Sequence, residues 1–276
     1  MPATDYHISL YLIYLMQNEC SSSKIEEVIY YIAWAHNIAG YNNPCASELV
    51  KNVAEGAKRQ LSRPCSKKEP ITPEILIQLV NRFGSTDNLL DKRIVTMCLI
   101  GYAGFLRFSE IVNIRACDIQ FQSTHMSIFI EKSKTDKYRQ GSCVIIAKSN
   151  NITCPVTCLE SYIKDAEINL EDDKFIFRQI TFFKKSNTHK LRNDSRHISY
   201  TRARELLLEK LQSLGRDKTK FGLHSLRSGG ATSAANAGIS DRNFKKHGRW
   251  KSDRAKDGYV KEDLKTQLSV SQNLGI

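Results

Sequence analysis

The sequence predicts a mainly α-helical protein of the α+β class, with one small antiparallel sheet and two domains. Helix caps and glycine stops recur along most of the 276 residues. One stretch breaks this pattern: Met126, Ile128 and Ile130 recur with the period of two that is typical of a β-strand. A basic segment bracketed by prolines, residues 63–70, is typical of a linker.

The residues before the linker predict a small helical domain, residues 1–65. Its helices are expected at about 4–17, from a capping box at Ser23–Glu26 to about Ile38, and over 48–61 after a Ser47 cap. Gly40 is the expected stop of the second helix.

The residues after the linker predict a larger domain, residues 66–276. Thr72 and Pro73 are the cap and first residue of a helix. Helices are expected at about 73–83, 87–103, 156–168, 200–214, 225–237, 241–247 and 252–262. Strands are expected at 126–130 and 144–146, joined by a polar turn over 132–141, and a third strand can form at 118–122.

The charge distribution favours a polyanionic partner. The chain carries 41 Lys and Arg against 29 Asp and Glu. Residues 1–65 are close to neutral, so the surplus falls in the larger domain. A membrane or secreted protein is disfavoured, because the longest apolar stretch, 94–106, is too short to span a bilayer and no basic signal region opens the chain.

The eight cysteines are expected to be reduced thiols in an intracellular protein. Cys154 and Cys158 have no second Cys or His pair nearby with the spacing of a zinc site, so we expect no metal ligands. No phosphate-binding loop and no acidic metal cluster is recognisable, and we expect no cofactor and no small-molecule substrate.

Three short motifs carry the chemistry. Arg107 follows an apolar helix and has Glu110 three residues on, where a carboxylate can orient it. His224 and Arg227 share one face at a helix start. Taken singly, the first motif is better explained by a structural ion pair, and the second is a weak signal that a capping histidine and a surface arginine also explain.

The third motif lies in residues 245–262, KKHGRWKSDRAKDGYVKE. It contains Trp250, one of two tryptophans, and Tyr259 nine residues later. Such residues are more often core residues with a polar tip. The order of these residues along the chain (Arg, Lys, His-x-x-Arg, Trp, Tyr) is more informative than any of the three motifs alone.

In that order the chain resembles the tyrosine recombinase (phage integrase) family over residues 70–262. The resemblance places the family's catalytic residues on Arg107, Lys134, His224, Arg227, Trp250 and Tyr259, with Glu110 as support. Lys132 is the alternative to Lys134. The forms SKTD, LHSLRSGGAT and HGRW look most like recombinases of eukaryotic DIRS-like and Crypton-type mobile elements. The first domain resembles the family's helical core-binding (SAM-like) domain, either whole or truncated.

The resemblance implies site-specific cleavage and rejoining of duplex DNA through a 3′-phosphotyrosine, without metal or ATP. Two arginines would neutralise the phosphorane-like state, and Tyr259 would attack once its proton is accepted. Lys134 would protonate the leaving 5′ oxygen. The resemblance also implies a tetramer on synapsed DNA, with residues 263–276 docked on a neighbour, and a nuclear location if the source is eukaryotic.

Basic residues outside the motifs are expected to contact DNA phosphates. They are Lys58, Arg59, Arg63, Arg139, Lys184, Lys185, Arg202 and Arg249. Two rival interpretations stay open: a catalytically idle DNA-binding protein derived from such an enzyme, and a relaxing enzyme like the type IB topoisomerases. A complete set of active-site residues argues against the first, and the single predicted hairpin and small size argue against the second.

Overall fold

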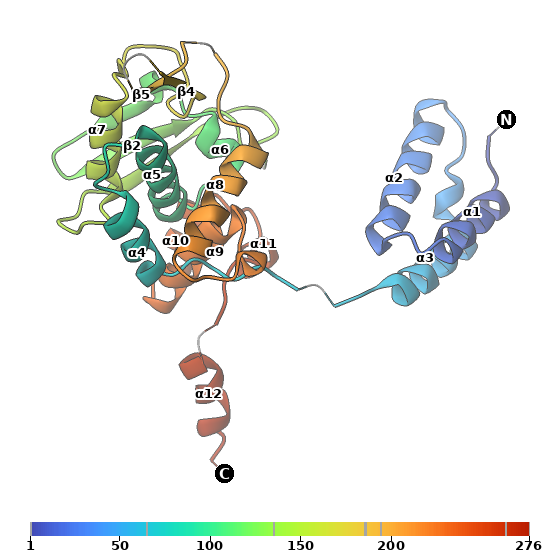
Figure 1. The fold of residues 1–276 in the computed structure, drawn as a ribbon. Helices are drawn as coiled ribbons and strands as arrows, with labels where there is room; N and C mark the ends of the chain where they lie inside the picture. Colours follow the sequence, from blue (N-terminus) through green and yellow to red (C-terminus); the bar gives the residue numbers. More distant parts are fainter. Residues whose placement is uncertain are drawn as a thin grey trace. The chain divides into compact units, whose positions relative to one another are not determined.

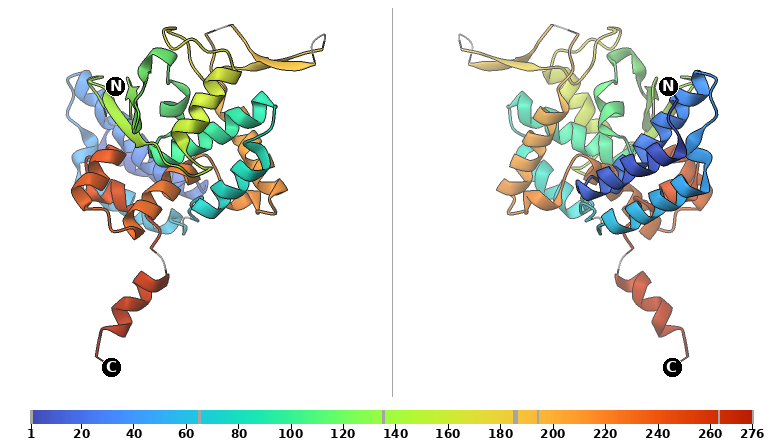
Figure 2. Two further views of the ribbon diagram at one scale, coloured as in Figure 1. Left: turned by 90° about the vertical axis from the view of Figure 1, so that its left-hand side faces the viewer. Right: turned by 90° about the vertical axis from the view of Figure 1, so that its right-hand side faces the viewer.

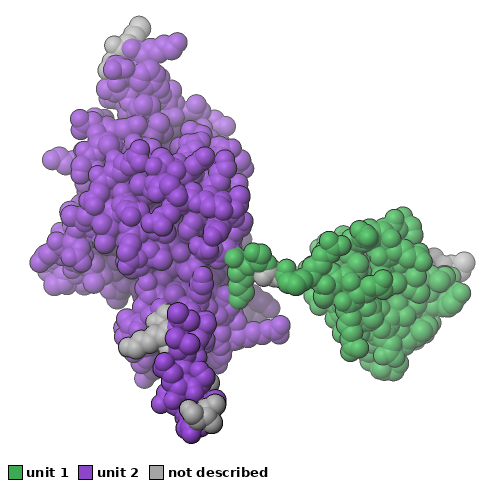
Figure 3. Space-filling view, turned by 60° about the horizontal axis from the view of Figure 1, so that its bottom comes forward, with its two compact units in different colours: residues 1–67 green, residues 68–276 purple. Residues whose placement is uncertain are grey.

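The computed structural model describes residues 2–64, 66–134, 136–184, 187–193, 195–262 and 264–275. The chain divides into two compact units, residues 1–67 and 68–276, which Figure 3 shows in different colours. This division lies two residues beyond the boundary predicted after residue 65. Both units are built mostly from helices, and the predicted fold class is confirmed (Figure 1).

Unit 1 is a three-helix bundle of α1 (Asp5–Gln17), α2 (Ser22–Ile38) and α3 (Glu48–Leu61), with a 3-10 turn at Pro44–Ala46. Leu12, Ile25 and Val50, one from each helix, are almost fully buried and lie in its core. The bundle matches the predicted helices closely.

Two caps of unit 1 differ from the prediction. Ser21, and not Ser23, caps α2 by accepting a hydrogen bond from the main-chain N–H of Lys24. Three consecutive serines can each fill this role, so the sequence alone does not choose among them. Ser47 precedes α3 as predicted, but its hydroxyl donates to Asp5 Oδ2 at 3.0 Å and does not cap the helix.

Unit 2 is organised around one central helix, α5 (Leu89–Ala103). Every residue from Arg93 to Gly101 is buried, because other helices cover α5 on several sides. These are α4 (Pro73–Phe83), α7 (Pro155–Asp165), α8 (Tyr200–Ser213) and α9 (His224–Asn236). The apolar run that the sequence shows at 94–106 is therefore the core of this unit.

The predicted sheet is present and has three antiparallel strands in the order β1 (Ile119–Phe121), β2 (His125–Ile130) and β3 (Ser142–Ala147). Ile128 of β2 pairs with Ile119 on one side and with Val144 on the other. Met126, Ile128 and Ile130 are all buried, which confirms the period of two.

A second hairpin, β4 (Ile180–Phe183) and β5 (Thr188–Leu191), was not predicted. It projects from the body of unit 2 (Figure 2). Phe182 and Phe183 are both about half exposed although they are neighbours on one strand. Since neither face of the hairpin is buried, the strands carry no apolar alternation that a sequence pattern could reveal.

The last part of unit 2 holds α10 (Asp241–Gly248), α11 (Asp253–Asp257) and α12 (Leu264–Gln272). The short helix α6 (Phe108–Val112) follows α5. The helix predicted over 252–262 is shorter, because α11 ends with Gly258 as its C-cap. Tyr259 therefore follows the helix instead of lying within it. Across the described ranges, every helix falls short of the length and apolarity that a membrane crossing requires.

Candidate active site

Arg107 is held by the turn between α5 and α6. It is the N-cap residue of α6, and Glu110 lies in the first turn of that helix. Glu110 accepts from the main-chain N–H of Arg107 at 2.8 Å and from its Nη1 at 2.9 Å. Glu110 is only 1% exposed, so this carboxylate fixes Arg107 from inside the protein.

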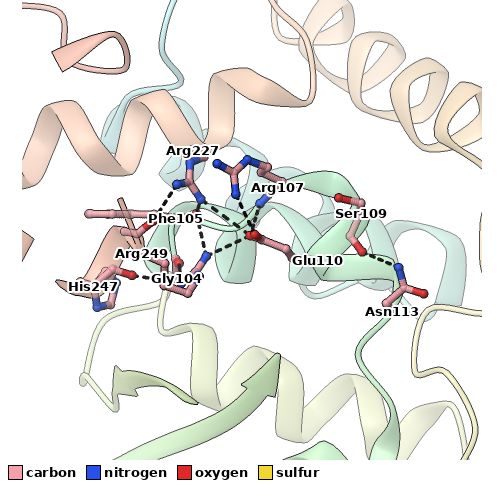
Figure 4. Close-up of polar contacts among 10 residues, drawn as sticks. Gly104, Phe105, Arg107, Ser109, Glu110, Asn113, Arg227, His247 and Arg249 are labelled. Carbon is pink, nitrogen blue, oxygen red and sulfur yellow. Dashed lines mark hydrogen bonds and ion pairs between the residues drawn. The ribbon is translucent and has the colours of Figure 1, made fainter. Parts of the chain in front are cut away.

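Arg227 lies one turn into α9. Its side chain has no exposed surface. Nη1 donates to the carbonyl oxygen of Phe105, and Nη2 donates to that of Gly248 at 2.7 Å. Nη1 is also 3.7 Å from Glu110 Oε2, so one carboxylate faces both arginines of the predicted pair (Figure 4).

Two glycines allow α9 to approach α5 and the segment before α4 closely. A Cβ atom at Gly229 would lie 2.0 Å from the carbonyl oxygen of Ile71, and one at Gly230 would lie 2.1 Å from that of Tyr102. Both oxygens belong to the main chain and cannot give way easily. The small residues that the sequence shows after Arg227 thus serve helix packing.

Trp250 and Tyr259 lie over the guanidinium of Arg227. The Arg227 carbon Cζ is 4.7 Å from the Trp250 ring and 4.9 Å from the Tyr259 ring, and the two rings are 5.6 Å apart. Trp250 is 6% exposed, and its indole N–H is buried without a hydrogen-bond partner among the described residues. That N–H is an unused hydrogen-bond donor within the cluster.

Arg249 belongs to the same cluster. Its side chain is 9% exposed, and Nη2 donates to Glu110 Oε2 at 2.9 Å. The neighbouring His247 lies edge-on against Phe105, with Nε2 2.7 Å from the carbonyl oxygen of Ala103. The structure therefore places Arg249, one of the residues predicted to contact DNA phosphates, inside the cluster and bonded to Glu110.

The electrostatics of the cluster suit an anion. Burial lowers the pKa of Arg227 to about 10, and the charge of Arg107 adds to this effect. Burial also lowers the pKa of His224, and the charges of Arg107, Arg227 and Lys134 lower it further. His224 is therefore neutral at pH 7 and able to accept a proton or a hydrogen bond.

Lys134 lies in the turn between β2 and β3. Its side chain is exposed, and its positive charge is among those that lower the pKa of His224. Asp136 stabilises the turn by accepting from the main-chain N–H of Gly141 at 2.8 Å. Lys132, the alternative to Lys134, pairs with its neighbour Glu131. Lys134 thus stays the predicted choice, with Lys132 as its alternative.

The other residues predicted to bind DNA lie outside this cluster. Lys58 pairs with Glu55 and Glu26, and Arg202 is half exposed and pairs with Glu205. The side chains of four more are exposed: Arg59, Arg63, Arg139 and Lys184. Lys185 lies outside the described residues.

Sequence reasoning missed two contributors to the site. One is the main chain at Phe105, whose φ of 47° turns its carbonyl oxygen toward Arg227 and Arg249. The other is the inward position of Arg249. Neither has a sequence signal, because backbone carbonyls are not encoded by side-chain type and a surface arginine and a buried one look alike.

Comparison with known proteins identifies the family. The sequence model of the phage integrase family matches residues 72–265. An "integrase/recombinase xerD homolog" of Selenomonas ruminantium is 29% identical over 230 residues, covering 83% of this chain. The match covers 64% of that relative's length.

Solved structures of low sequence identity share the fold. The Tn1549 transposon integrase (residues 82–397) in complex with circular intermediate DNA has a TM-score of 0.60 at 13% identity, covering 98% of this chain and 85% of that one. The XerH site-specific recombinase bound to its difH substrate has a TM-score of 0.53 at 14% identity, covering 97% and 94%. Together with the family match over most of the chain, the arrangement of Arg107, Arg227 and Tyr259 leads to one conclusion: this chain belongs to the phage integrase family of tyrosine recombinases.

Proposed function

We propose that this protein cleaves and rejoins duplex DNA at specific sites by transesterification through Tyr259. The observation that carries the proposal is the Tyr259 ring, which lies against the guanidinium of Arg227 within a cluster of arginines. A nucleophile beside fixed cations is the arrangement that attack on a phosphodiester requires.

The proposed steps use the following residues. The Tyr259 oxygen attacks the phosphorus and loses its proton, with His224 as acceptor. Arg107, Arg227 and the indole N–H of Trp250 stabilise the added negative charge on the non-bridging oxygens. The bond to the 5′ oxygen breaks, and Lys134 supplies the proton that this oxygen needs. Attack by another 5′ hydroxyl reverses the sequence, so the phosphodiester energy is retained without ATP.

Relatives suggest the biological setting. The Tn1549 integrase acts for a transposon, and the XerH structure is a complex with its DNA substrate. For this chain we propose a mobile-element recombinase close to the eukaryotic DIRS-like and Crypton kinds, which would act in the nucleus. We also propose unit 1 as the core-binding domain and a tetramer as the active assembly. Leu264, Leu268 and Leu274 are exposed at the C-terminal end and could contact a neighbouring protomer.

A covalent-adduct assay tests the activity. Nicked suicide duplexes from a randomised pool, together with any repeats flanking the gene, are incubated with protein in EDTA and run on a denaturing gel. The wild type should give an adduct, Tyr259→Phe should give none, and Lys134→Ala should give far less. Tyr138→Phe is the matched control, because Tyr138 is an 87% exposed tyrosine in the turn that carries Lys134.

The same assay separates the rival functions. Salt-sensitive DNA binding without any adduct would favour an idle DNA-binding protein. An adduct that supports relaxation of supercoils, but never the joining of two different duplexes, would favour a topoisomerase.

A further inference from the structure

Arg249 has a backbone conformation that is unusual for its residue type. It follows α10 with φ 55° and ψ 37°, in the left-handed region. Side chains other than glycine are strained there, because Cβ crowds the carbonyl oxygen. Non-glycine residues in such conformations persist where the surrounding structure holds them, and they cluster at functional sites. The left-handed backbone of Arg249 must therefore be stabilised by other interactions of this residue.

The side chain supplies those interactions. Nη1 donates to the carbonyl oxygens of His247 at 3.0 Å and Gly104 at 3.2 Å. Nη2 donates to the carbonyl oxygen of Phe105 at 3.2 Å and to Glu110 Oε2 at 2.9 Å. Arg249 therefore ties the end of α10 to the turn that presents Arg107. Only a planar guanidinium can reach all four acceptors at once.

The contact also changes how Glu110 acts on the two catalytic arginines. Oε2 of Glu110 accepts from Arg249 at 2.9 Å, whereas Arg227 stays 3.7 Å away. One carboxylate thus faces three guanidiniums, and the cluster carries a net charge of +2. Without Arg249 the same carboxylate would neutralise half of the charge of Arg107 and Arg227.

We infer that Arg249 is a positioning residue, which satisfies Glu110 so that Arg107 and Arg227 keep their full charge and orientation for the scissile phosphate. The inference rests on the proposed function. A phosphodiester carries one negative charge, and the pentacoordinate state has more on its non-bridging oxygens. A site of net +2 therefore favours the transition state over bound substrate. Loss of Arg249 should slow cleavage more than it weakens DNA binding.

The experiment measures single-turnover adduct formation and DNA affinity for Arg249→Gly, Arg249→Lys and Arg249→Asn. Glycine and asparagine suit the left-handed backbone, so these variants remove the side chain without adding strain. Arg242→Gly is the matched control, an exposed arginine on the same helix α10. We expect Arg249→Gly to lower the cleavage rate by ~10- to 100-fold, as loss of a supporting residue does. Its DNA dissociation constant and salt dependence should stay unchanged, and methylguanidinium should restore part of the rate.

Three results would overturn the inference. One is a weaker and less salt-dependent DNA affinity with an unchanged cleavage rate, which would make Arg249 a phosphate contact. Another is a cleavage rate equal to that of the wild type. The third is an equal loss in Arg249→Gly and Arg249→Lys, accompanied by a large fall in melting temperature and no rescue, which would make its role structural.

A second measurement separates this inference from the proposed function. Tungstate, a tetrahedral dianion, is titrated into the protein without DNA. Removing one positive charge from the site should weaken its binding about tenfold in Arg249→Gly, while Tyr259→Phe should leave it unchanged. If the wild type forms no adduct but this difference appears, the recombinase function fails and the role of Arg249 stands. Equal tungstate affinity in wild type and Arg249→Gly would refute the role of Arg249 by itself.

Discussion

Replacing Glu110 by glutamine should destabilise unit 2 severely. The substitution keeps the size of the side chain and removes its charge. Glu110 is 1% exposed and holds Arg107 and Arg249 at 2.9 Å, with Arg227 at 3.7 Å. In Glu110→Gln three guanidiniums, all of them mostly buried, would lack their shared counter-ion.

The size of the effect follows from this burial. Removing one partner of a buried ion pair costs about 3–5 kcal/mol, because the remaining charge cannot return to water. Three cations share one carboxylate here, but contributions within one network are not additive, and the glutamine oxygen can still accept one hydrogen bond. We therefore expect a loss of about 3–5 kcal/mol in the free energy of unfolding. A typical domain has only about 5–15 kcal/mol in total.

Tryptophan fluorescence can measure this loss for unit 2 by itself. Trp34 belongs to unit 1 and is 54% exposed, whereas Trp250 is 6% exposed and lies over Arg227. In a Trp34→Phe background, urea unfolding followed by fluorescence reports on Trp250. Glu205→Gln is the control, since its pair with Arg202 is half exposed and should contribute less than about 1 kcal/mol. A Glu110→Gln variant within about 1 kcal/mol of its background would refute the reasoning.

Three further predictions concern the packing, the pH dependence and the hairpin. Gly230→Ala should prevent unit 2 from folding stably, because its Cβ would lie 2.1 Å from the Tyr102 carbonyl oxygen, and circular dichroism should show a melting temperature many degrees lower. The cleavage rate should stay high as the pH falls to 6.5 and drop only below it, because burial and nearby cations hold the pKa of His224 below that value and protonation removes the proton acceptor. Asp136→Ala should lower the cleavage rate by ~10-fold with little change in DNA affinity, because the hairpin turn loses the hydrogen bond from Gly141.

Each of these predictions has a control. Gly56→Ala adds a Cβ within α3 with no atom within 4 Å and should be neutral or stabilising. His224→Gln should remove the fall in cleavage rate at low pH. If this fall persists in the variant, a group other than His224 causes it. Asp217→Ala removes an exposed turn carboxylate of unit 2 remote in sequence from the hairpin and should leave the cleavage rate unchanged. An equal loss from Asp136→Ala and Asp217→Ala would contradict a specific role for the hairpin.

The elements with strong local signals could be predicted from the sequence. Thr72 and Pro73 give the start of α4, Ser199 gives the start of α8, and both helices lie within a residue or two of the expected bounds. The period of two at 126–130 gave β2. The β4–β5 hairpin could not be found in this way, because no residue of its strands is fully buried and the segment has the composition of a basic loop.

The candidate site likewise contains residues that the sequence predicts and residues that it does not. Arg107, Arg227 and Tyr259 stand out through their order and spacing, and the structure brings them together. The inward turn of Arg249 depends on a left-handed residue after α10 and on the carbonyl oxygen of Phe105. These are properties of the folded backbone, and a short sequence motif does not reveal them.

The two closely packed glycines of α9 have a consequence for genetics. Every amino-acid change that a single nucleotide can make in a glycine codon adds at least a Cβ atom, and at Gly229 and Gly230 that atom would meet a main-chain oxygen at 2.0–2.1 Å. No missense change at either codon is therefore expected to be silent for folding. In a genome that holds several copies of this gene, these two codons would mark which copies can still encode a folded protein.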